Sequence, residues 1–247
     1  MNLLIDIGNS RVKWAQQKND VLQSCDACCY EKGVSLEFFD PAFDSMPKPD
    51  RVFVSNVAGE KIARELSAYL DNKWSILPTY LEVRGEAAGV TNAYDDFTQL
   101  GIDRWLAMIA AWNYYRTAVC IVDCGTALTA DVVTASGHHQ GGSIVPGLKL
   151  MAEALNTRTE QINYMSDCNA SLKPGRNTSE CISNGALAAV AALIDTVFDE
   201  VMREHGSDSH CVITGGYAED IGRSLTVDVD YDAHLVLNGI ATLTGNP

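Results

Sequence analysis

Basic residues are scarce in this chain, and their scarcity argues against one class of partner. Lys and Arg together number 18, against 32 Asp and Glu, which gives a formal net charge of −14 at pH 7. Nucleic acids are bound through clustered Lys and Arg, and the few basic residues here are scattered. We therefore expect no nucleic-acid partner. An acidic protein can still bind a nucleotide, because backbone amides and a metal ion meet the phosphates locally.

Targeting signals are also missing from the sequence. The opening residues offer no basic stretch followed by a long apolar run, so no signal peptide is predicted. No apolar segment is expected to be long enough to span a membrane. These two absences predict a cytoplasmic protein without a membrane partner.

The eight cysteines lack the spacing of a metal site or a disulfide framework. Cys25-x-x-Cys28-Cys29 is the one cluster, and neither a second C-x-x-C nor a nearby His pair completes four ligands. Free, mostly buried thiols in a reducing cytosol are the better interpretation.

Two familiar phosphate-binding motifs are absent as well, and a repeated motif stands in their place. The chain contains neither a Walker A sequence nor G-x-G-x-x-G, which excludes a P-loop and a dinucleotide fold. Instead, an apolar run ending in Asp6-x-Gly8 is echoed half a chain later by one ending in Asp123-x-Gly125. A second apolar run follows each copy, which is the pattern of a β-hairpin with a carboxylate at the end of its first strand.

The repeat predicts two related half-domains, residues 1–116 and 117–247, each with strands first and helices alternating afterwards. This is α/β organisation, and a phosphate chain with its metal could lie between the two hairpins. Later in the chain, Asn177 and Glu180 predict the capped start of a long helix that ends near Glu204.

The first turn carries groups suited to phosphate. Gly8 allows a close approach of backbone to ligand, and Asn9, Ser10 and the exposed amides can donate to phosphate oxygens. Asp6 is placed to hold a hydrated Mg²⁺, and Lys13 could add a positive charge. The alternative is an ordinary Asx-type hairpin turn with a solvated lysine. The second copy again offers a carboxylate, a glycine and a hydroxyl, which favours the phosphate interpretation.

Two further segments are candidates for the rest of a site. Gly215-Gly216 follows a predicted strand and suits an adenine or ribose lying against backbone, although a plain strand-to-helix turn would look the same. Asp103 stands at the start of a helix, where the helix dipole keeps a carboxylate ionised. Simple N-terminal charge compensation is the alternative for Asp103.

Four motifs together resemble those of one family. They are Asp6-x-Gly8-Asn9-Ser10-x-x-Lys13, Gly101-x-Asp103-Arg104, Asp123-x-Gly125-Thr126-Ala127 and Gly141-Gly142-x-Ile144-x-Pro146-Gly147. With Gly215-Gly216 they resemble the phosphate and adenosine motifs of the acetate kinase, sugar kinase, heat-shock chaperone and actin superfamily. The closer match is to the type III pantothenate kinases.

The resemblance implies a fold and an activity. The fold would be α/β, with two related actin-like, ribonuclease H-like half-domains that each hold a mixed β-sheet flanked by helices. The activity would be ATP-dependent phosphorylation of pantothenate to 4′-phosphopantothenate, the first step of coenzyme A biosynthesis. The cofactors would be ATP, Mg²⁺ and a monovalent cation, K⁺ or NH4⁺, and the protein would be a homodimer.

The same resemblance assigns roles to residues. Asp103 would be the general base, Arg104 would anchor the anionic end of the substrate, and Asp123 would hold the monovalent cation. The other substrate-binding residues would be Tyr94, Gly101, Ile102 and, from the partner subunit, Thr178. The ATP-binding residues would be Asp6, Ile7, Gly8, Asn9, Ser10, Arg11, Val12, Lys13, Thr126, Gly215 and Gly216. One departure affects Tyr94: the family often has a proline between this tyrosine and Gly101, and this chain has none there.

Two rival functions stay open on the sequence. Phosphate-binding turns do not name the acceptor, so a kinase or phosphatase of the same superfamily with another acceptor fits the same residues. A nucleotide-binding regulator without catalysis is the second rival. Its weakness is that Asp6, Asp103 and Asp123 are all present, since a regulator has no need of the three carboxylates.

Overall fold

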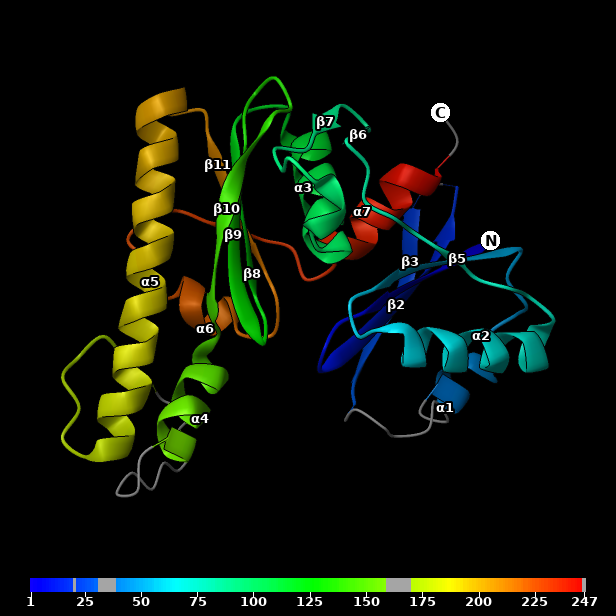
Figure 1. Cartoon of the computed structure of the whole chain (residues 1–247), viewed down its shortest axis with the longest axis horizontal. Coiled ribbons are helices and arrows are strands. Elements are labelled where there is room, and N and C mark those ends of the chain that lie inside the picture. The colour runs from blue at the N-terminus through cyan, green and yellow to red at the C-terminus, as the bar shows by residue number, and fades with distance from the viewer. Residues whose placement is uncertain (20, 31–38, 159–169, 246–247) are drawn as a thin grey trace. The chain divides into compact units, whose positions relative to one another are not determined.

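The computed structural model describes residues 1–19, 21–30, 39–158 and 170–245, and it divides into two compact units (Figure 1). Unit 1 is formed by Met1–Asn113 together with His234–Pro247, and unit 2 by Tyr114–Ala233. A five-stranded sheet is the centre of each unit. The predicted class, α/β with two related half-domains, is confirmed.

Unit 1 is built on a mixed sheet with strand order β3-β2-β1-β4-β5. Strands β1 to β3 form an antiparallel meander, and β4 and β5 run parallel to β1. The strands are β1 (Asn2–Ile7), β2 (Arg11–Lys18), β3 (Val21–Cys29), β4 (Arg51–Asn56) and β5 (Thr79–Tyr80). The helices are α1 (Asp40–Phe43), α2 (Glu60–Trp74), α3 (Ile102–Tyr115) and α7 (Leu235–Thr244). The last two residues of α3 belong to unit 2. A small hairpin is formed by β6 (Glu86–Ala87) and β7 (Val90–Thr91).

Strand alternation decides which side chains of unit 1 enter the core. Leu3, Ile5 and Ile7 of β1 point to one face, where they share a buried cluster with Leu66 and Leu70 of α2. Leu4 and Asp6 point to the opposite face. Helix α7 covers that opposite side of the sheet, as Figure 1 shows.

Unit 2 repeats this plan with strand order β10-β9-β8-β11-β12. Strands β8 to β10 are again an antiparallel meander, and β11 and β12 again run parallel to the first strand. The strands are β8 (Val119–Cys124), β9 (Ala127–Val133), β10 (His139–Pro146), β11 (His210–Thr214) and β12 (Asp230–Tyr231), and the helices are α4 (Leu148–Arg158), α5 (Thr178–His205) and α6 (Ala218–Gly222). The sequence repeat therefore reflects a repeat of topology.

Helix α5 covers one face of the second sheet. Its side chains Leu187, Val190, Ile194 and Phe198 share a core cluster with alternate residues of β8, β9 and β11. By length and composition, α5 is apolar enough to cross a membrane, so the expectation that no segment is long enough was wrong. Such a helix is weak evidence for a membrane span, because a helix that packs in a core passes the same test.

The last helix joins the first unit. The predicted half-domains divided the chain at 116/117, whereas the structure groups His234–Pro247 with the N-terminal segment. The reason is apolar packing within unit 1: α7 buries Leu235, Leu237 and Ile240. Gly239 of α7 also approaches α3 so closely that an added Cβ would lie 2.1 Å from the carbonyl oxygen of Leu106.

Candidate functional site

The turn between β1 and β2 holds the first predicted phosphate-binding residues. Asp6 is 8% exposed at the carboxyl end of β1, while Asn9 and Ser10 are exposed at the tip. The Gly8 N–H donates to the Arg11 carbonyl at 3.0 Å, and an added Cβ on Gly8 would lie 3.2 Å from that same oxygen. A side chain at this position would therefore make a tight contact with the backbone of the turn. The turn presents a buried carboxylate below two exposed polar residues.

Tyr30 fixes this first turn from the side. Its hydroxyl donates to the Gly8 carbonyl at 2.6 Å, and its N–H donates to the Ser10 carbonyl at 3.1 Å. Burial, and after it the negative charge of Asp6, raises the pKa of the Tyr30 hydroxyl, so the group stays a donor at neutral pH. Tyr30 was not among the predicted site residues.

The turn between β8 and β9 is one residue shorter than the first, and its glycine again bonds to the first residue of the following strand. The Gly125 N–H donates to the Ala127 carbonyl at 3.1 Å, and Thr126 is exposed. Two other segments of unit 2 lie against this turn. The Gly147 N–H donates to the Thr126 carbonyl at 2.9 Å, and the Tyr217 N–H donates to the Cys124 carbonyl at 3.1 Å. The third motif, at Asp123, thus contacts the end of the fourth motif and the segment that follows Gly215-Gly216, all within unit 2.

Glycines surround the Asp123 carboxylate. A Cβ added to Gly215 would lie 2.6 Å from Asp123 Oδ1, and one added to Gly125 would lie 3.3 Å from the same atom. This carboxylate therefore lies in a backbone cradle that side chains at either position would fill. Burial raises the pKa of the neighbouring Cys124 thiol to about 12, and the negative charge of Asp123 adds to the effect.

The donor chemistry of both turns fits cations. The buried Asp6 carboxylate beside exposed polar residues suits Mg²⁺ held through water, because this ion keeps several waters in proteins. The cradle around Asp123 gives a cation a carboxylate with adjacent carbonyl oxygens. Within the described parts of the chain, no group of three or more His, Cys, Asp or Glu side chains could hold a metal ion.

The predicted acceptor residues lie at the start of α3. An added Cβ on Gly101 would lie 2.6 Å from Asp103 Oδ1, so the carboxylate rests against the glycine α-carbon. Asp103 Oδ1 also accepts from the Arg104 N–H at 2.8 Å. Ile102 and Arg104 are each 8% exposed, whereas Asp103 is half-buried. Of these three residues at the start of α3, Asp103 is therefore the most accessible.

Tyr94 reaches the same place despite the missing proline. The Arg104 guanidinium donates to the Tyr94 hydroxyl at 3.0 Å and lies 5.8 Å from the centre of the tyrosine ring. The segment between them closes into a short 3₁₀ helix, Phe97–Gln99, whose N-cap Asp96 accepts from the Thr98 N–H. A polar cap therefore shapes this loop without the proline. Asn92, whose Oδ1 accepts from the Tyr94 N–H at 2.9 Å, joins this group and was not predicted.

Thr178 is exposed in the first turn of α5. The predicted cap before it is confirmed: Asn177 Oδ1 accepts from the Glu180 N–H at 2.9 Å, and the Glu180 carboxylate accepts from Asn177 Nδ2 and the Arg176 N–H, both at 2.7 Å. Thr178 belongs to unit 2, whereas Tyr94 and Asp103 belong to unit 1.

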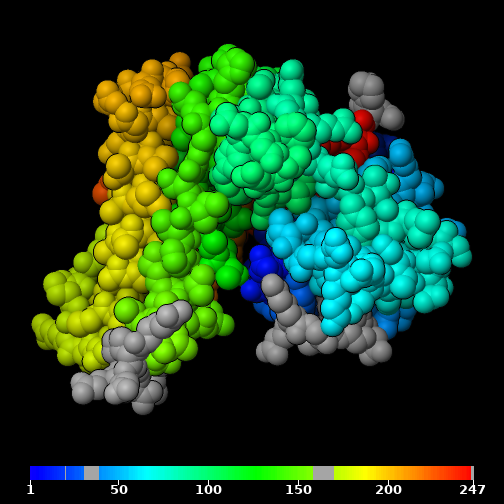
Figure 2. Space-filling model, in the orientation of Figure 1, coloured from blue at the N-terminus to red at the C-terminus, as the bar shows by residue number. Residues whose placement is uncertain are grey.

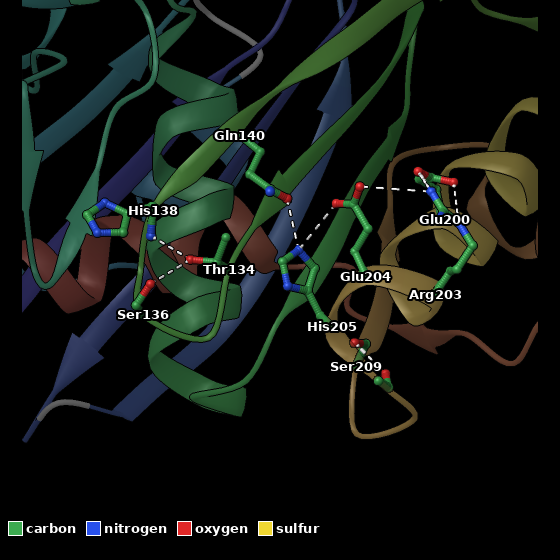
Figure 3. A network of polar contacts seen from close by, with 10 residues as sticks. Thr134, Ser136, His138, Gln140, Glu200, Arg203, Glu204, His205 and Ser209 are labelled. Atoms are coloured by element: carbon green, nitrogen blue, oxygen red, sulfur yellow. Dashed lines mark hydrogen bonds and ion pairs between the residues drawn. The ribbon is translucent and has the colours of Figure 1, made fainter.

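At the far end of α5, a polar network joins the helix to β10 (Figure 3). His205 Nε2 lies 3.0 Å from Gln140 Oε1, and Glu200 pairs with Arg203. Beside it lies a groove of about 510 Å³ with valine side chains and two glutamates in its lining. These polar groups already bond to one another, so the network explains how β10 is fixed.

Cysteines are less buried than predicted. Of the seven in the described segments, all free, Cys120, Cys124 and Cys211 are buried, whereas Cys29 and Cys181 are exposed. Cys25, Cys28 and Cys29 lie on β3, the edge strand of the first sheet.

Solved structures place the fold in a class. The chain is similar over 98% of its length to a protein described as a Baf family transcriptional activator from Campylobacter jejuni, with a TM-score of 0.61, 21% identity and 96% of that chain covered. A protein described as a 2-dehydro-3-deoxygalactonokinase from Sinorhizobium meliloti matches with a TM-score of 0.54 and 10% identity, with 98% of both chains covered. These likenesses define the class: proteins of the actin-like ATPase and sugar kinase fold.

Sequence comparisons then define the family. The family model described as type III pantothenate kinase matches residues 2–200. A type III pantothenate kinase from Nitrosococcus oceani is 39% identical over 246 residues, which cover 98% of this chain and 92% of the relative. Another from Aromatoleum aromaticum is 35% identical, with 98% and 97% covered. The chain belongs to the type III pantothenate kinase family.

Proposed function

We propose that this chain phosphorylates pantothenate with ATP, the first step of coenzyme A biosynthesis, and that Asp103 is its general base. The chain is a phosphotransferase by family. The observation that carries the assignment of residues is the group at the start of α3, where Asp103 rests on Gly101 and the Arg104 guanidinium holds the Tyr94 hydroxyl at 3.0 Å.

The reaction needs little covalent chemistry from the protein. The substrate hydroxyl oxygen bonds to the γ-phosphorus, the bond from γ-phosphorus to the β–γ bridging oxygen breaks, and ADP leaves. Asp103 accepts the hydroxyl proton. Because phosphoryl transfer depends mainly on positioning, the base need not remove the hydroxyl proton completely before transfer. Arg104 and Tyr94 bind the substrate, with the guanidinium meeting its carboxylate through two parallel N–H donors.

The two turns bind the nucleotide. In the first turn, Asn9 and Ser10 donate to phosphate oxygens, and Gly8 lets the backbone approach them closely. Ile7, Arg11, Val12 and Lys13 complete the hairpin around them. Thr126 donates to the phosphates, and Gly215 and Gly216 face the adenosine. Asp6 would hold Mg²⁺, and Asp123 would hold K⁺ or NH4⁺. When bound, these cations neutralise charge on the phosphates.

The active form is a homodimer that uses the N-terminal half of α5. A cavity of about 520 Å³ with an apolar lining lies between α4 and α5, and its residues include Met151, Ile182 and Ala186. In Figure 2, α5 (yellow) lies along the left edge of the molecule, and its outer side faces solvent. A second copy would cover this apolar surface, and Thr178, at the same end of α5, would then reach the substrate of the partner subunit. We place the protein in the cytoplasm, without nucleic acid or membrane as a partner.

Release of ADP by the purified protein tests the proposal. With Mg·ATP, K⁺ and pantothenate, turnover is expected, and it falls when choline replaces K⁺. Sugars and small alcohols in place of pantothenate serve as the control for the acceptor. Turnover on one of these alone would establish a superfamily kinase with another acceptor. Nucleotide binding without any turnover would instead support a regulator.

A further inference from the structure

Two buried hydroxyl groups lie beside the two motif carboxylates. Ser55, at the end of β4, is 0% exposed, and Thr214, at the end of β11, is 1% exposed. Among the residues that the structure describes, neither hydroxyl oxygen has a hydrogen-bond partner. Burial of a polar group without a partner is unfavourable, so such groups are rare in native proteins and require an explanation.

The two hydroxyls occupy equivalent positions in the internal repeat. In unit 1, Ser55 pairs in parallel register with Asp6, and in unit 2, Thr214 pairs in parallel register with Asp123. Strands β4 and β11 hold the same place in their sheets, next to β1 and β8 respectively. The same unfavourable feature thus occurs twice, at matching sites, which argues against chance.

Each hydroxyl also points to the same face as its carboxylate. The core residues of β4 and β11 are Val52 and Val54 in one case, and Cys211 and Ile213 in the other. Side chains alternate along a strand, so Ser55 and Thr214 point to the opposite face. Directly paired residues of parallel strands share a face, so each hydroxyl lies on the face of Asp6 or of Asp123.

We propose that Ser55 and Thr214 are ligand-binding groups, one at each cation site. The Ser55 hydroxyl bonds to water of the Mg²⁺ held at Asp6, and the Thr214 hydroxyl contributes an oxygen to the monovalent cation at Asp123. Hard cations take oxygen ligands, and a hydroxyl supplies both a donor and two lone pairs. The inference rests on the proposed function, because it assumes that cations are bound with the nucleotide.

The variants Ser55→Ala and Thr214→Val remove each hydroxyl and nearly keep its shape. Calorimetric titration with the non-hydrolysable analogue AMP-PNP measures affinity with Mg²⁺ and K⁺, without Mg²⁺, and with choline in place of K⁺. Thermal unfolding without ligand gives the stability of each variant. The control is Ser67→Ala in α2, whose hydroxyl does bond, to the Ala63 carbonyl at 2.9 Å.

A crossed pattern is expected. Ser55→Ala weakens binding about tenfold in the presence of Mg²⁺ and keeps the response to K⁺, because a hydrogen bond toward a charged group is lost. Thr214→Val loses the response to K⁺ and keeps that to Mg²⁺. Both variants unfold at or above the wild-type temperature, since a buried group without a partner is gone. Ser67→Ala unfolds earlier and binds as the wild type does.

The outcomes separate this inference from the proposed function. Wild-type affinity in both variants, whether they are more or less stable, would overturn the inference and leave the kinase assignment standing. Equal loss of both cation responses in each variant would also overturn it, because the two sites would not be distinct. If the wild-type protein does not bind AMP-PNP with Mg²⁺ and K⁺, the proposed function itself fails.

Discussion

The contact between Gly215 and the Asp123 carboxylate makes Gly215→Ala an informative substitution. Gly215 has φ +98°, and an added Cβ would lie 2.6 Å from Asp123 Oδ1 and from the carbonyl carbon and oxygen of Cys124. The variant therefore combines backbone strain with a steric clash. Gly206→Ala is a matched control, because Gly206 has φ +94° and nothing lies within 4 Å of its added Cβ.

The two costs can be estimated separately. Holding a residue with a Cβ in such a backbone conformation costs roughly 1–3 kcal/mol. Forcing an extra methyl group into a packed site costs roughly 1–3 kcal/mol more. We expect Gly206→Ala to show the first cost alone, so Gly215→Ala should lose about 1–3 kcal/mol more in the free energy of unfolding.

Thermal unfolding of the three proteins, followed by calorimetry in the same buffer, checks this expectation. For a protein of 247 residues, a difference of about 1 kcal/mol shifts the unfolding midpoint by roughly 2–4 °C, so Gly215→Ala should unfold at least about 2 °C below Gly206→Ala. The displaced carboxylate should also weaken the response of nucleotide binding to K⁺. Equal midpoints for the two variants would refute the packing of Asp123 and Cys124 against Gly215.

Three further outcomes are expected. Asp103→Asn abolishes pantothenate-dependent ADP release while AMP-PNP binding by calorimetry stays close to wild type, and near-wild-type turnover would remove Asp103 from the role of base. Tyr94→Phe raises the KM for pantothenate several-fold with a smaller change in kcat, because the Arg104 guanidinium loses the hydroxyl that orients it; an unchanged KM would contradict that role. At pH 8, iodoacetamide should label the exposed Cys29 and leave Cys124 unlabelled, as read by mass spectrometry. The thiolate is the reactive form, and the pKa of Cys124 is raised to about 12. Rapid labelling of Cys124 in the folded protein would show that its burial is wrong.

The doubled hairpin was predictable because local chemistry defines it. A carboxylate, a glycine and flanking apolar runs specify a strand, a turn and a second strand within a few residues. The capped start of α5 was predictable for the same reason, since Asn177 and Glu180 satisfy each other locally. Both features depend on neighbours in the sequence.

The features that were missed depend on pairing between distant segments. Ser55 and Thr214 each lie within the last two residues of an apolar strand, where small hydroxyl residues are common. Only the register next to Asp6 and Asp123 distinguishes these two. The position of α7 was missed because an apolar helix pattern does not state which sheet it covers. The loop after Tyr94 could have been read from Asp96 and Thr98, which form a cap of recognisable type.

The return of α7 to unit 1 has a consequence for synthesis. Unit 2 is continuous in the chain, whereas unit 1 is interrupted by it. At about 5–20 residues per second, the ribosome finishes the strands of unit 1 on the order of ten seconds before it makes α7. During that interval the sheet face that carries Leu4 is not yet covered by α7, while Tyr114–Ala233 can fold as a whole. The nascent chain is thus expected to complete its second half first, and the earliest segment to be made is among the last to be protected from aggregation.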